Sequence, residues 1–140
     1  MRYLLDTCAI SELIAKRPNP DVVQWIDSLD DGQVYLSVIT LGEIKRGIEK
    51  LPDSIRKSQL NDWLNDDLLI RFKGRILTID TPVMLIWGAL IARLERQGRT
   101  LPAMDSLIAS IALHGGYHLV TRNERDFAGT GVDVINPWKP

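Results

Sequence analysis

Short apolar runs alternate along the chain with longer stretches in which apolar residues recur at helical spacing. The runs predict strands, and the stretches between them predict helices. This alternating order is typical of right-handed βαβ units, whose sheet is covered by helices on both faces. We therefore expect an α/β fold, a three-layer α/β/α sandwich with a mostly parallel central sheet of about five strands. The predicted strands are residues 3–5, 34–38, 75–79, 117–121 and 132–135.

Proline, glycine and acidic residues bound the helical stretches. Pro82 fits the first turn of one helix, and Gly98 is expected to end it. Neither an internal repeat nor a shift in composition divides the chain, so we expect residues 1–140 to form a single domain. The predicted helices are residues 9–14, 20–29, 40–50, 55–72, 82–97, 102–114 and, as a short turn, 122–127.

Composition places the chain among ordinary globular proteins. Of its 140 residues, 45% are apolar and 25% are charged, and there is no polar low-complexity segment. A single cysteine, Cys8, has no partner for an internal disulfide. No apolar run approaches the roughly 20 residues that span a bilayer, and the N-terminus enters a strand directly instead of a signal sequence. We expect a cytoplasmic protein that does not enter a membrane.

The charge balance excludes a strong overall attraction to nucleic acid. With 17 basic and 18 acidic side chains the net charge is −1, so any contact with nucleic acid must come from a local basic group. For each single residue, a solvated helix face is the simpler interpretation. The candidates are Lys45, Arg46 and Lys50 after the second predicted strand, Arg93, Arg96 and Arg99 on a later helix, and Arg122 and Arg125 near the C-terminus.

Three acids occupy equivalent places next to predicted strands and helix starts. Asp6 follows the first strand, Glu43 lies in the first turn after the second strand, and Asp105 lies in the first turn of the helix before the fourth strand. Taken singly, each can be a helix cap: Thr40 and Glu43 fit a capping box, and Asp6 and Asp105 suit the positive end of a helix. In a parallel sheet, however, all three are expected near one edge, where open α/β folds bind ligands.

Carboxylates gathered at one edge would raise each other's pKa unless a cation lay between them. Oxygen ligands without a cysteine and histidine constellation suit Mg²⁺ or Mn²⁺, and Cys8, His114 and His118 lack the spacing of a zinc site. A cation held in this way supports hydrolysis of a phosphodiester. Three hydroxyls next to the acids are candidates for holding ligands or water, namely those of Thr7, Ser106 and Thr121.

Ordered segments along nearly the whole chain resemble the PIN-domain ribonucleases, and within them the VapC-type toxins of bacterial toxin–antitoxin pairs. The ending INPW is especially similar to the branch that includes the FitB proteins. The segments are LLDTCAISEL at 4–13, LSVITLGEIKRGI at 36–48, LPAMDSLIASIAL at 101–113, LVTRNERDF at 119–127 and GVDVINPW at 131–138.

The resemblance implies a PIN-like fold and an endoribonuclease that depends on Mg²⁺ or Mn²⁺. It implies that Asp6, Glu43 and Asp105 are the acids of the metal site. Of these, Asp6 and Asp105 are expected to bind the metal directly. The fourth acid differs between members, so Asp126 is taken as the fourth catalytic acid and Asn123 as a supporting ligand of water or substrate. Cys8 stands where many members have asparagine.

The resemblance also implies partners. These are an RNA substrate, for which transfer RNA and ribosomal RNA are the candidates, a cognate antitoxin, and a second copy of the chain in a homodimer. No base-reading pattern in the sequence chooses between the two RNA classes.

Other interpretations of an acid after the first strand are weaker. A haloacid dehalogenase-type enzyme expects a second aspartate where Cys8 stands, and a receiver domain needs paired acids and a late lysine that are not evident. The alternative from a different class is a non-catalytic PIN-like module that binds RNA or protein. The presence of all three principal acids favours the nuclease over this module.

Overall fold

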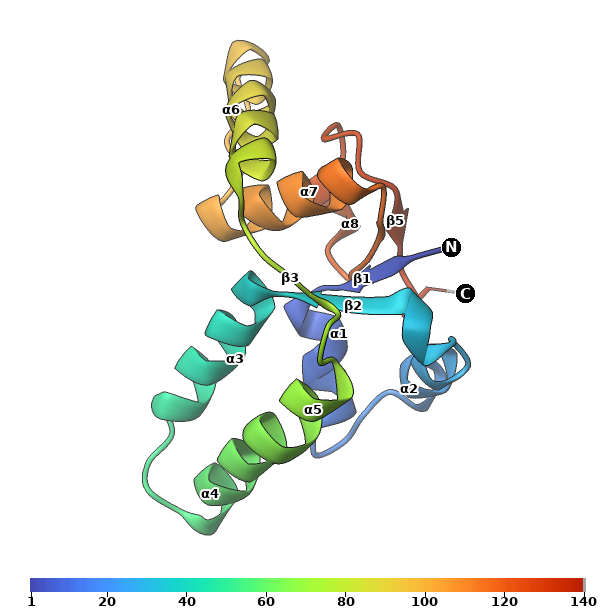
Figure 1. The fold of residues 1–140 in the computed structure, drawn as a ribbon, viewed down its shortest axis with the longest axis vertical. Coiled ribbons are helices and arrows are strands. Elements are labelled where there is room, and N and C mark those ends of the chain that lie inside the picture. Colours follow the sequence, from blue (N-terminus) through green and yellow to red (C-terminus); the bar gives the residue numbers. More distant parts are fainter. Residues whose placement is uncertain (140) are drawn as a thin grey trace.

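Five parallel strands form the central sheet of the protein, seen here in a computed structural model that describes residues 1–139 (Figure 1). They are β1 (Tyr3–Leu5), β2 (Val34–Ser37), β3 (Ile76–Leu77), β4 (His118–Val120) and β5 (Val134–Ile135). Their order across the sheet is β3-β2-β1-β4-β5, and every neighbouring pair is parallel. The predicted fold class is therefore confirmed, and the sheet is parallel throughout. Residue 140, the last of the predicted domain, lies outside the described residues.

Helices cover both faces of the sheet. In Figure 1, α6 and α7 lie on one side, and α1, α3, α4 and α5 lie on the other. Among residues 1–139, no helix combines the length and the hydrophobicity that a membrane span requires. The helices are α1 (Thr7–Leu13), α2 (Pro20–Asp27), the 3₁₀ turn η1 (Asp31–Gln33), α3 (Val38–Glu49), α4 (Ile55–Asp62), the π-helical η2 (Trp63–Leu68), α5 (Leu69–Arg71), α6 (Thr81–Arg96), α7 (Ala103–Gly115) and α8 (Glu124–Phe127).

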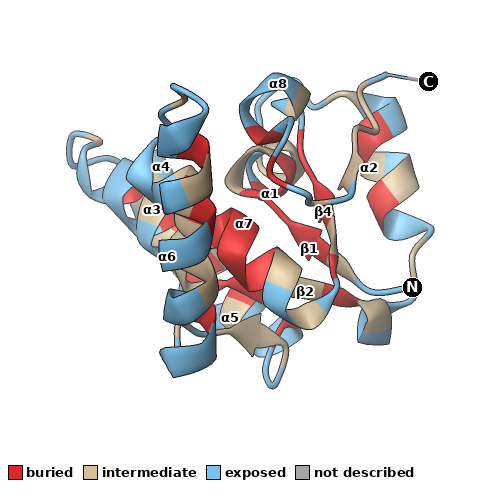
Figure 2. Ribbon diagram, turned by 90° about the horizontal axis from the view of Figure 1, so that it is seen from above, coloured by how far each residue is buried: buried red, intermediate tan, exposed pale blue. Residues whose placement is uncertain are grey.

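Successive residues of the strands pack into two separate hydrophobic cores, one on each face of the sheet. Leu4 and Leu119 point to the face covered by α6 and α7, whereas Leu5 and Val120 point to the face covered by α1 to α4. All four side chains are fully buried. Figure 2 shows β1 and β4 buried at the centre, with the exposed faces of the helices turned outward. Because both faces are covered, the strands are apolar without alternation apart from Ser37 and His118 at strand ends, as expected for a buried parallel sheet.

The long helix predicted for residues 55–72 is interrupted by the wider turns of η2. Its buried residues Leu60, Leu64, Leu68 and Phe72 recur every four positions. An α-helix has 3.6 residues per turn, so a strict four-residue repeat would drift around its axis and leave the core. The wider π-helical turns keep these side chains on one face.

The start of α3 excludes the capping box that was one interpretation of Thr40 and Glu43. The cap is Ser37, whose side-chain oxygen accepts the backbone N–H of Thr40 at 3.2 Å. Thr40 lies inside the helix, and Glu43 is therefore not the acid of a capping box. The sequence contains both possible caps, and β2 ends early enough that its last residue becomes the cap.

Replacing Ser37 by alanine is expected to lower the free energy of unfolding by about 1 kcal/mol, because the buried N–H of Thr40 loses its acceptor. Urea denaturation followed by circular dichroism measures the change. Ser11→Ala is the matched control, since Ser11 is exposed on α1 and its substitution should be nearly neutral. Equal stabilities of the two variants would contradict the assignment of the cap.

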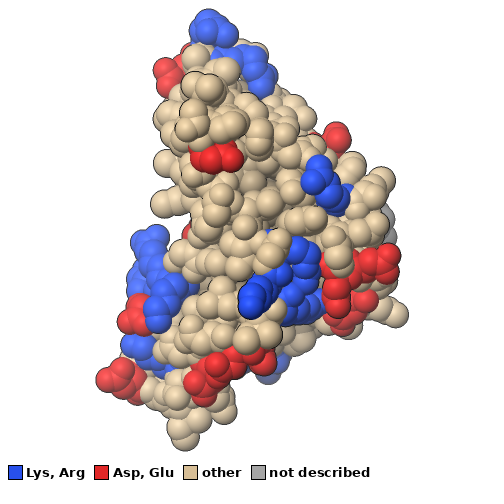
Figure 3. Space-filling model, in the orientation of Figure 1, with Lys and Arg blue, Asp and Glu red and all other residues tan. Residues whose placement is uncertain are grey.

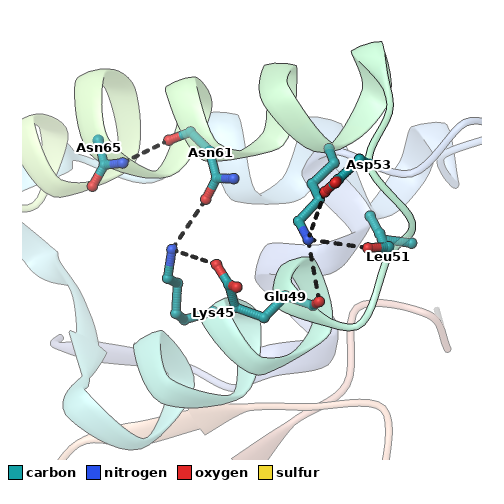
Figure 4. A network of polar contacts seen from close by, with 7 residues as sticks. Lys45, Glu49, Leu51, Asp53, Asn61 and Asn65 are labelled. Atoms are coloured by element: carbon teal, nitrogen blue, oxygen red, sulfur yellow. Dashed lines mark hydrogen bonds and ion pairs between the residues drawn. The ribbon is translucent and has the colours of Figure 1, made fainter.

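A polar network joins α3 to α4 on the surface (Figure 4). Lys45 contacts Glu49 at 2.9 Å and donates a hydrogen bond to Asn61 at 3.2 Å. Lys57 donates to the backbone oxygens of Glu49 and Leu51 at the end of α3. The neighbouring ammonium of Lys45 lowers the pKa of Glu49. Lys45, a predicted candidate for nucleic-acid contact, is thus engaged within the fold.

The strand order creates one switch point in the sheet. From β1 the chain proceeds through β2 to β3 in one direction, whereas β4 and β5 extend the sheet in the other. The carboxyl ends of β1 and β4 are therefore adjacent, and the segments that follow them diverge to opposite sides. In open α/β folds such a crevice is the usual ligand site.

Candidate functional site

Asp6 lies at this switch point and is held by both neighbouring segments. Its backbone N–H continues the sheet by donating to Val120 at 3.0 Å. Its Oδ1 accepts the backbone N–H of Thr7 at 2.8 Å, and its Oδ2 accepts the hydroxyl of Thr121 at 2.8 Å. The residue caps α1, as one interpretation of the sequence predicted, and only 5% of its surface is exposed. These bonds fix the orientation of a carboxylate that is almost completely buried at the carboxyl end of β1.

Glu43 reaches the same edge from α3. The hydroxyl of Thr7 donates to its Oε1 at 2.6 Å, and the hydroxyl of the buried Thr40 lies 3.3 Å from that of Thr7. The carboxylate is therefore tied to the start of α1 and not to the start of its own helix. The role of Thr40 was missed from the sequence, where its spacing from Glu43 matched a cap equally well.

Asp105 lies in the first turn of α7, where the charges of the other acids affect its pKa. Partial burial, together with the charges of Asp6, Asp126 and Glu43, raises its pKa from 3.8 to about 6. Burial and the charge of Glu43 also raise the pKa of Asp6, although the Thr121 hydroxyl and the Thr7 amide oppose the shift. The fold thus brings Asp6, Glu43 and Asp126 within electrostatic range of Asp105.

The two candidates for the fourth position lie on the segment after β4. Asp126 is exposed on α8 and contributes to the raised pKa of Asp105. Asn123 is also exposed, and its side chain makes no capping hydrogen bond to α8. Its backbone N–H donates to the hydroxyl oxygen of Thr121 at 3.1 Å. Asp126 therefore affects Asp105 through its charge. Asn123 is connected to Asp6 through the hydroxyl of Thr121.

The predicted supporting hydroxyls have different surroundings. Those of Thr7 and Thr121 bind the acids directly, as described above. The hydroxyl of Ser106 accepts the indole N–H of Trp87 at 2.8 Å and donates to the backbone oxygen of Ala103 at 2.6 Å. Ser106 is fully buried, so this hydroxyl joins α6 to α7.

Cys8 contributes a link that the sequence did not reveal. Its Sγ lies 3.5 Å from the hydroxyl oxygen of Thr121 and accepts the backbone N–H of Arg122 at 3.4 Å. Burial raises the pKa of the thiol, which keeps it protonated and unreactive at neutral pH. Cys8 thus ties the turn after β1 to the segment after β4.

Carboxylates at the topological switch point of an α/β/α fold are typical of proteins that bind a cation or a phosphate there. The family model described as "PIN domain" matches residues 3–132, and the chain therefore belongs to the PIN-domain family. This confirms the family resemblance of the sequence segments.

Relatives of known name resemble the chain over its full length. Toxin FitB of Neisseria gonorrhoeae is 38% identical over 135 residues, which are 96% of this chain and 97% of that protein. VapC ribonuclease Y4jK of Sinorhizobium fredii is 33% identical over 137 residues, or 98% of both. In the crystal structure of FitAcB from Neisseria gonorrhoeae, a chain of 37% identity superposes with a TM-score of 0.94 and 99% coverage of both chains.

Proposed function

We propose that this protein is an endoribonuclease that acts as the toxin of a toxin–antitoxin pair. The observation that carries the proposal is the raised pKa of Asp105, about 6, which follows from its partial burial and from the charges of Asp6, Asp126 and Glu43. Such a concentration of carboxylates at one edge is unfavourable for folding and is typical of a functional site. The names of the relatives, a toxin and a ribonuclease, supply the reaction class and the biological setting.

The donor set fits a divalent cation, and we propose Mg²⁺ or Mn²⁺. The four carboxylates of Asp6, Glu43, Asp105 and Asp126 are hard oxygen donors, and a cation would offset the burial and the repulsion that raise the pKa values of Asp6 and Asp105. Asp6 and Asp105 would bind the ion directly, with Glu43 and Asp126 completing the acidic site. When bound, the ion would lower the pKa of a water and neutralise charge on the phosphodiester.

Residues of the chain itself orient this site. The Thr7 amide and the Thr121 hydroxyl hold the two oxygens of Asp6, and the Thr7 hydroxyl holds Glu43. We assign the fourth catalytic position to Asp126, because its charge acts on Asp105. Asn123 is assigned to supporting contacts with water or substrate.

Purified protein is expected to cleave transfer RNA or ribosomal RNA when Mg²⁺ or Mn²⁺ is present and to lose this activity in EDTA. Gel analysis of both RNA classes with each metal measures the activity and identifies the substrate class. Restored cleavage after metal is added back controls for irreversible inactivation. Cleavage that persists after complete chelation would contradict the metal-dependent mechanism.

The alternative, a PIN domain that binds RNA or protein without cleaving it, has one observation in its favour. Within residues 1–139, no three Asp, Glu, His or Cys side chains lie together as a ready metal-binding group. Mutual repulsion would separate carboxylates that lack a cation, so we favour the nuclease. Binding of RNA without cleavage at any metal concentration would favour the alternative.

We propose the remaining partners and the setting on the following grounds. A nuclease that attacks RNA of its own cell requires an antagonist, which supports a cognate antitoxin. Large apolar side chains that remain exposed support a homodimer, above all Leu85 on α6 with 71% exposure and Met104 on α7 with 52%. We place the protein in the cytoplasm, where its RNA substrates occur, and propose that residues 1–140 act as a single PIN domain.

A further inference from the structure

Basic side chains are divided into separate groups on the surface. On the face shown in Figure 3, lysines and arginines gather over α3, at the C-terminal end of α6 and near the centre, with neutral surface between them. The net charge is −1. A nucleic-acid strand must therefore be bound by one particular basic group, and a group near the acids is the best candidate for this binding site.

A polar groove lies along α8, directly after β4. It has a volume of about 430 Å³ and is lined by Arg122, Asn123, Glu124, Arg125, Asp126 and Lys139. Three cationic side chains therefore face two carboxylates. Lys139 pairs with Glu124 at 3.4 Å, but both side chains are well exposed, and such a pair is easily broken. Within residues 1–139, neither Arg122 nor Arg125 has an acidic partner within 4 Å.

The groove is connected to the acidic site. Arg122 follows Thr121, the residue whose hydroxyl binds Asp6, and its backbone N–H is held by the thiol of Cys8. Its guanidinium lies 5.9 Å from the centre of the Trp138 ring, which favours a defined orientation of the charge. Asp126, which also lines the groove, acts electrostatically on Asp105. A strand lying along α8 would therefore lead into the acids.

We propose that this groove binds a phosphodiester of single-stranded RNA next to the one that is cleaved, with Arg122 and Arg125 as its phosphate ligands. The proposal rests on the proposed function. Unpaired guanidinium groups form charge-assisted, bidentate hydrogen bonds to phosphate. A single strand is favoured over a duplex because Asp6 is buried, with only 5% of its surface exposed, and only a flexible strand can bring a phosphate close to it while its neighbour stays on α8.

The test measures binding apart from cleavage. In the Asp6→Asn background, fluorescence anisotropy with a labelled single-stranded RNA is recorded over a range of salt concentrations for Arg122→Gln, Arg125→Gln and the double variant. Each substitution is expected to weaken binding about tenfold. It should also reduce the slope of log K against log salt by about 0.7, whatever the sequence of the RNA. Arg17→Gln is the control, because Arg17 is exposed in the loop after α1, away from the groove.

Two results would overturn the proposal. The first is an affinity and salt slope of the double variant equal to those of the Arg17→Gln control; cleavage by the wild type would then still support the nuclease. The second is unchanged RNA binding with lost affinity for a labelled glutamate-rich peptide, which would make the groove a site for an acidic protein segment. If the slope falls but the wild type never cleaves RNA, the groove is supported and the proposed nuclease function fails. Thermal unfolding of every variant excludes loss of fold.

Discussion

Replacing Asp6 by asparagine is expected to reduce RNA cleavage on the order of 10³-fold or more, equivalent to about 4 kcal/mol of transition-state stabilisation. The variant should fold at least as well as the wild type. Burial raises the pKa of Asp6, so its ionised form is unfavourable in the metal-free fold. Asparagine removes the charge and keeps an oxygen for the N–H of Thr7, while the Thr121 hydroxyl can turn to accept from the amide. Initial rates on a fixed RNA, together with thermal unfolding, measure both effects.

Asp133→Asn is the matched control for this change. Asp133 is exposed and precedes β5 at the opposite, amino edge of the sheet, so the same chemical substitution should leave the cleavage rate unchanged. Retention of wild-type activity by Asp6→Asn would eliminate the carboxylate mechanism. Loss of activity in both variants would point to a general effect of lost negative charge.

Replacing Asp105 by asparagine is expected to abolish cleavage to a similar extent and to make the metal-free protein more stable at neutral pH. Partial burial and the neighbouring acids raise the pKa of Asp105 to about 6 in the fold, against 3.8 for an ordinary aspartate. The unfolded chain therefore releases this proton first, and the stability of the fold decreases as the pH rises from about 4 to about 6. Above that window the penalty is complete. It amounts to about 1–2 kcal/mol once solvent screening of this partly buried group is included.

Urea denaturation in EDTA between pH 4 and pH 8 measures the difference between Asp105→Asn and the wild type. The gain of the variant should be close to zero at pH 4 and reach its maximum near pH 7. Asp66→Asn, an exposed substitution on η2, should show no such pH dependence. In Mg²⁺ or Mn²⁺ the wild type should recover stability that the variant does not, because ligand binding stabilises only the fold that binds it. A pH-independent difference would contradict the coupling of the acids.

The elements could be predicted well wherever local pattern and burial agree. The five strands and the long helices follow from apolar runs and helical spacing, whereas the strand order that creates the switch point came from the structure. Two local details differ from what the sequence suggested, for a tertiary reason. Ser37 and not Thr40 caps α3, because pairing with β3 ends β2 at Ser37. The predicted helix of residues 55–72 contains η2, because the core selects a four-residue repeat.

The candidate site also has a part that the sequence predicts and a part that it does not. Its acids could be chosen from the sequence because carboxylates after strands and in first helical turns converge in any parallel α/β fold. The hydrogen bonds that orient these acids could not be predicted from the sequence. The hydroxyl of Thr7 donates to Glu43, 36 positions away in the sequence, and the hydroxyl of Thr121 donates to Asp6, 115 positions away. Hydroxyls of this kind are indistinguishable from turn residues until the chain folds.

By itself, the sequence determined which residues form the sheet, which face of each helix is buried and which acids reach the carboxyl edge, because these depend on the order of apolar and polar residues along the chain. Only the tertiary structure decided how the acids are oriented and how strongly they perturb one another. It also decided that Arg122, Arg125 and Asp126 line one groove. Hydrogen-bond geometry, desolvation and charge coupling depend on distances between segments far apart in the chain, and no local pattern of residues encodes those distances.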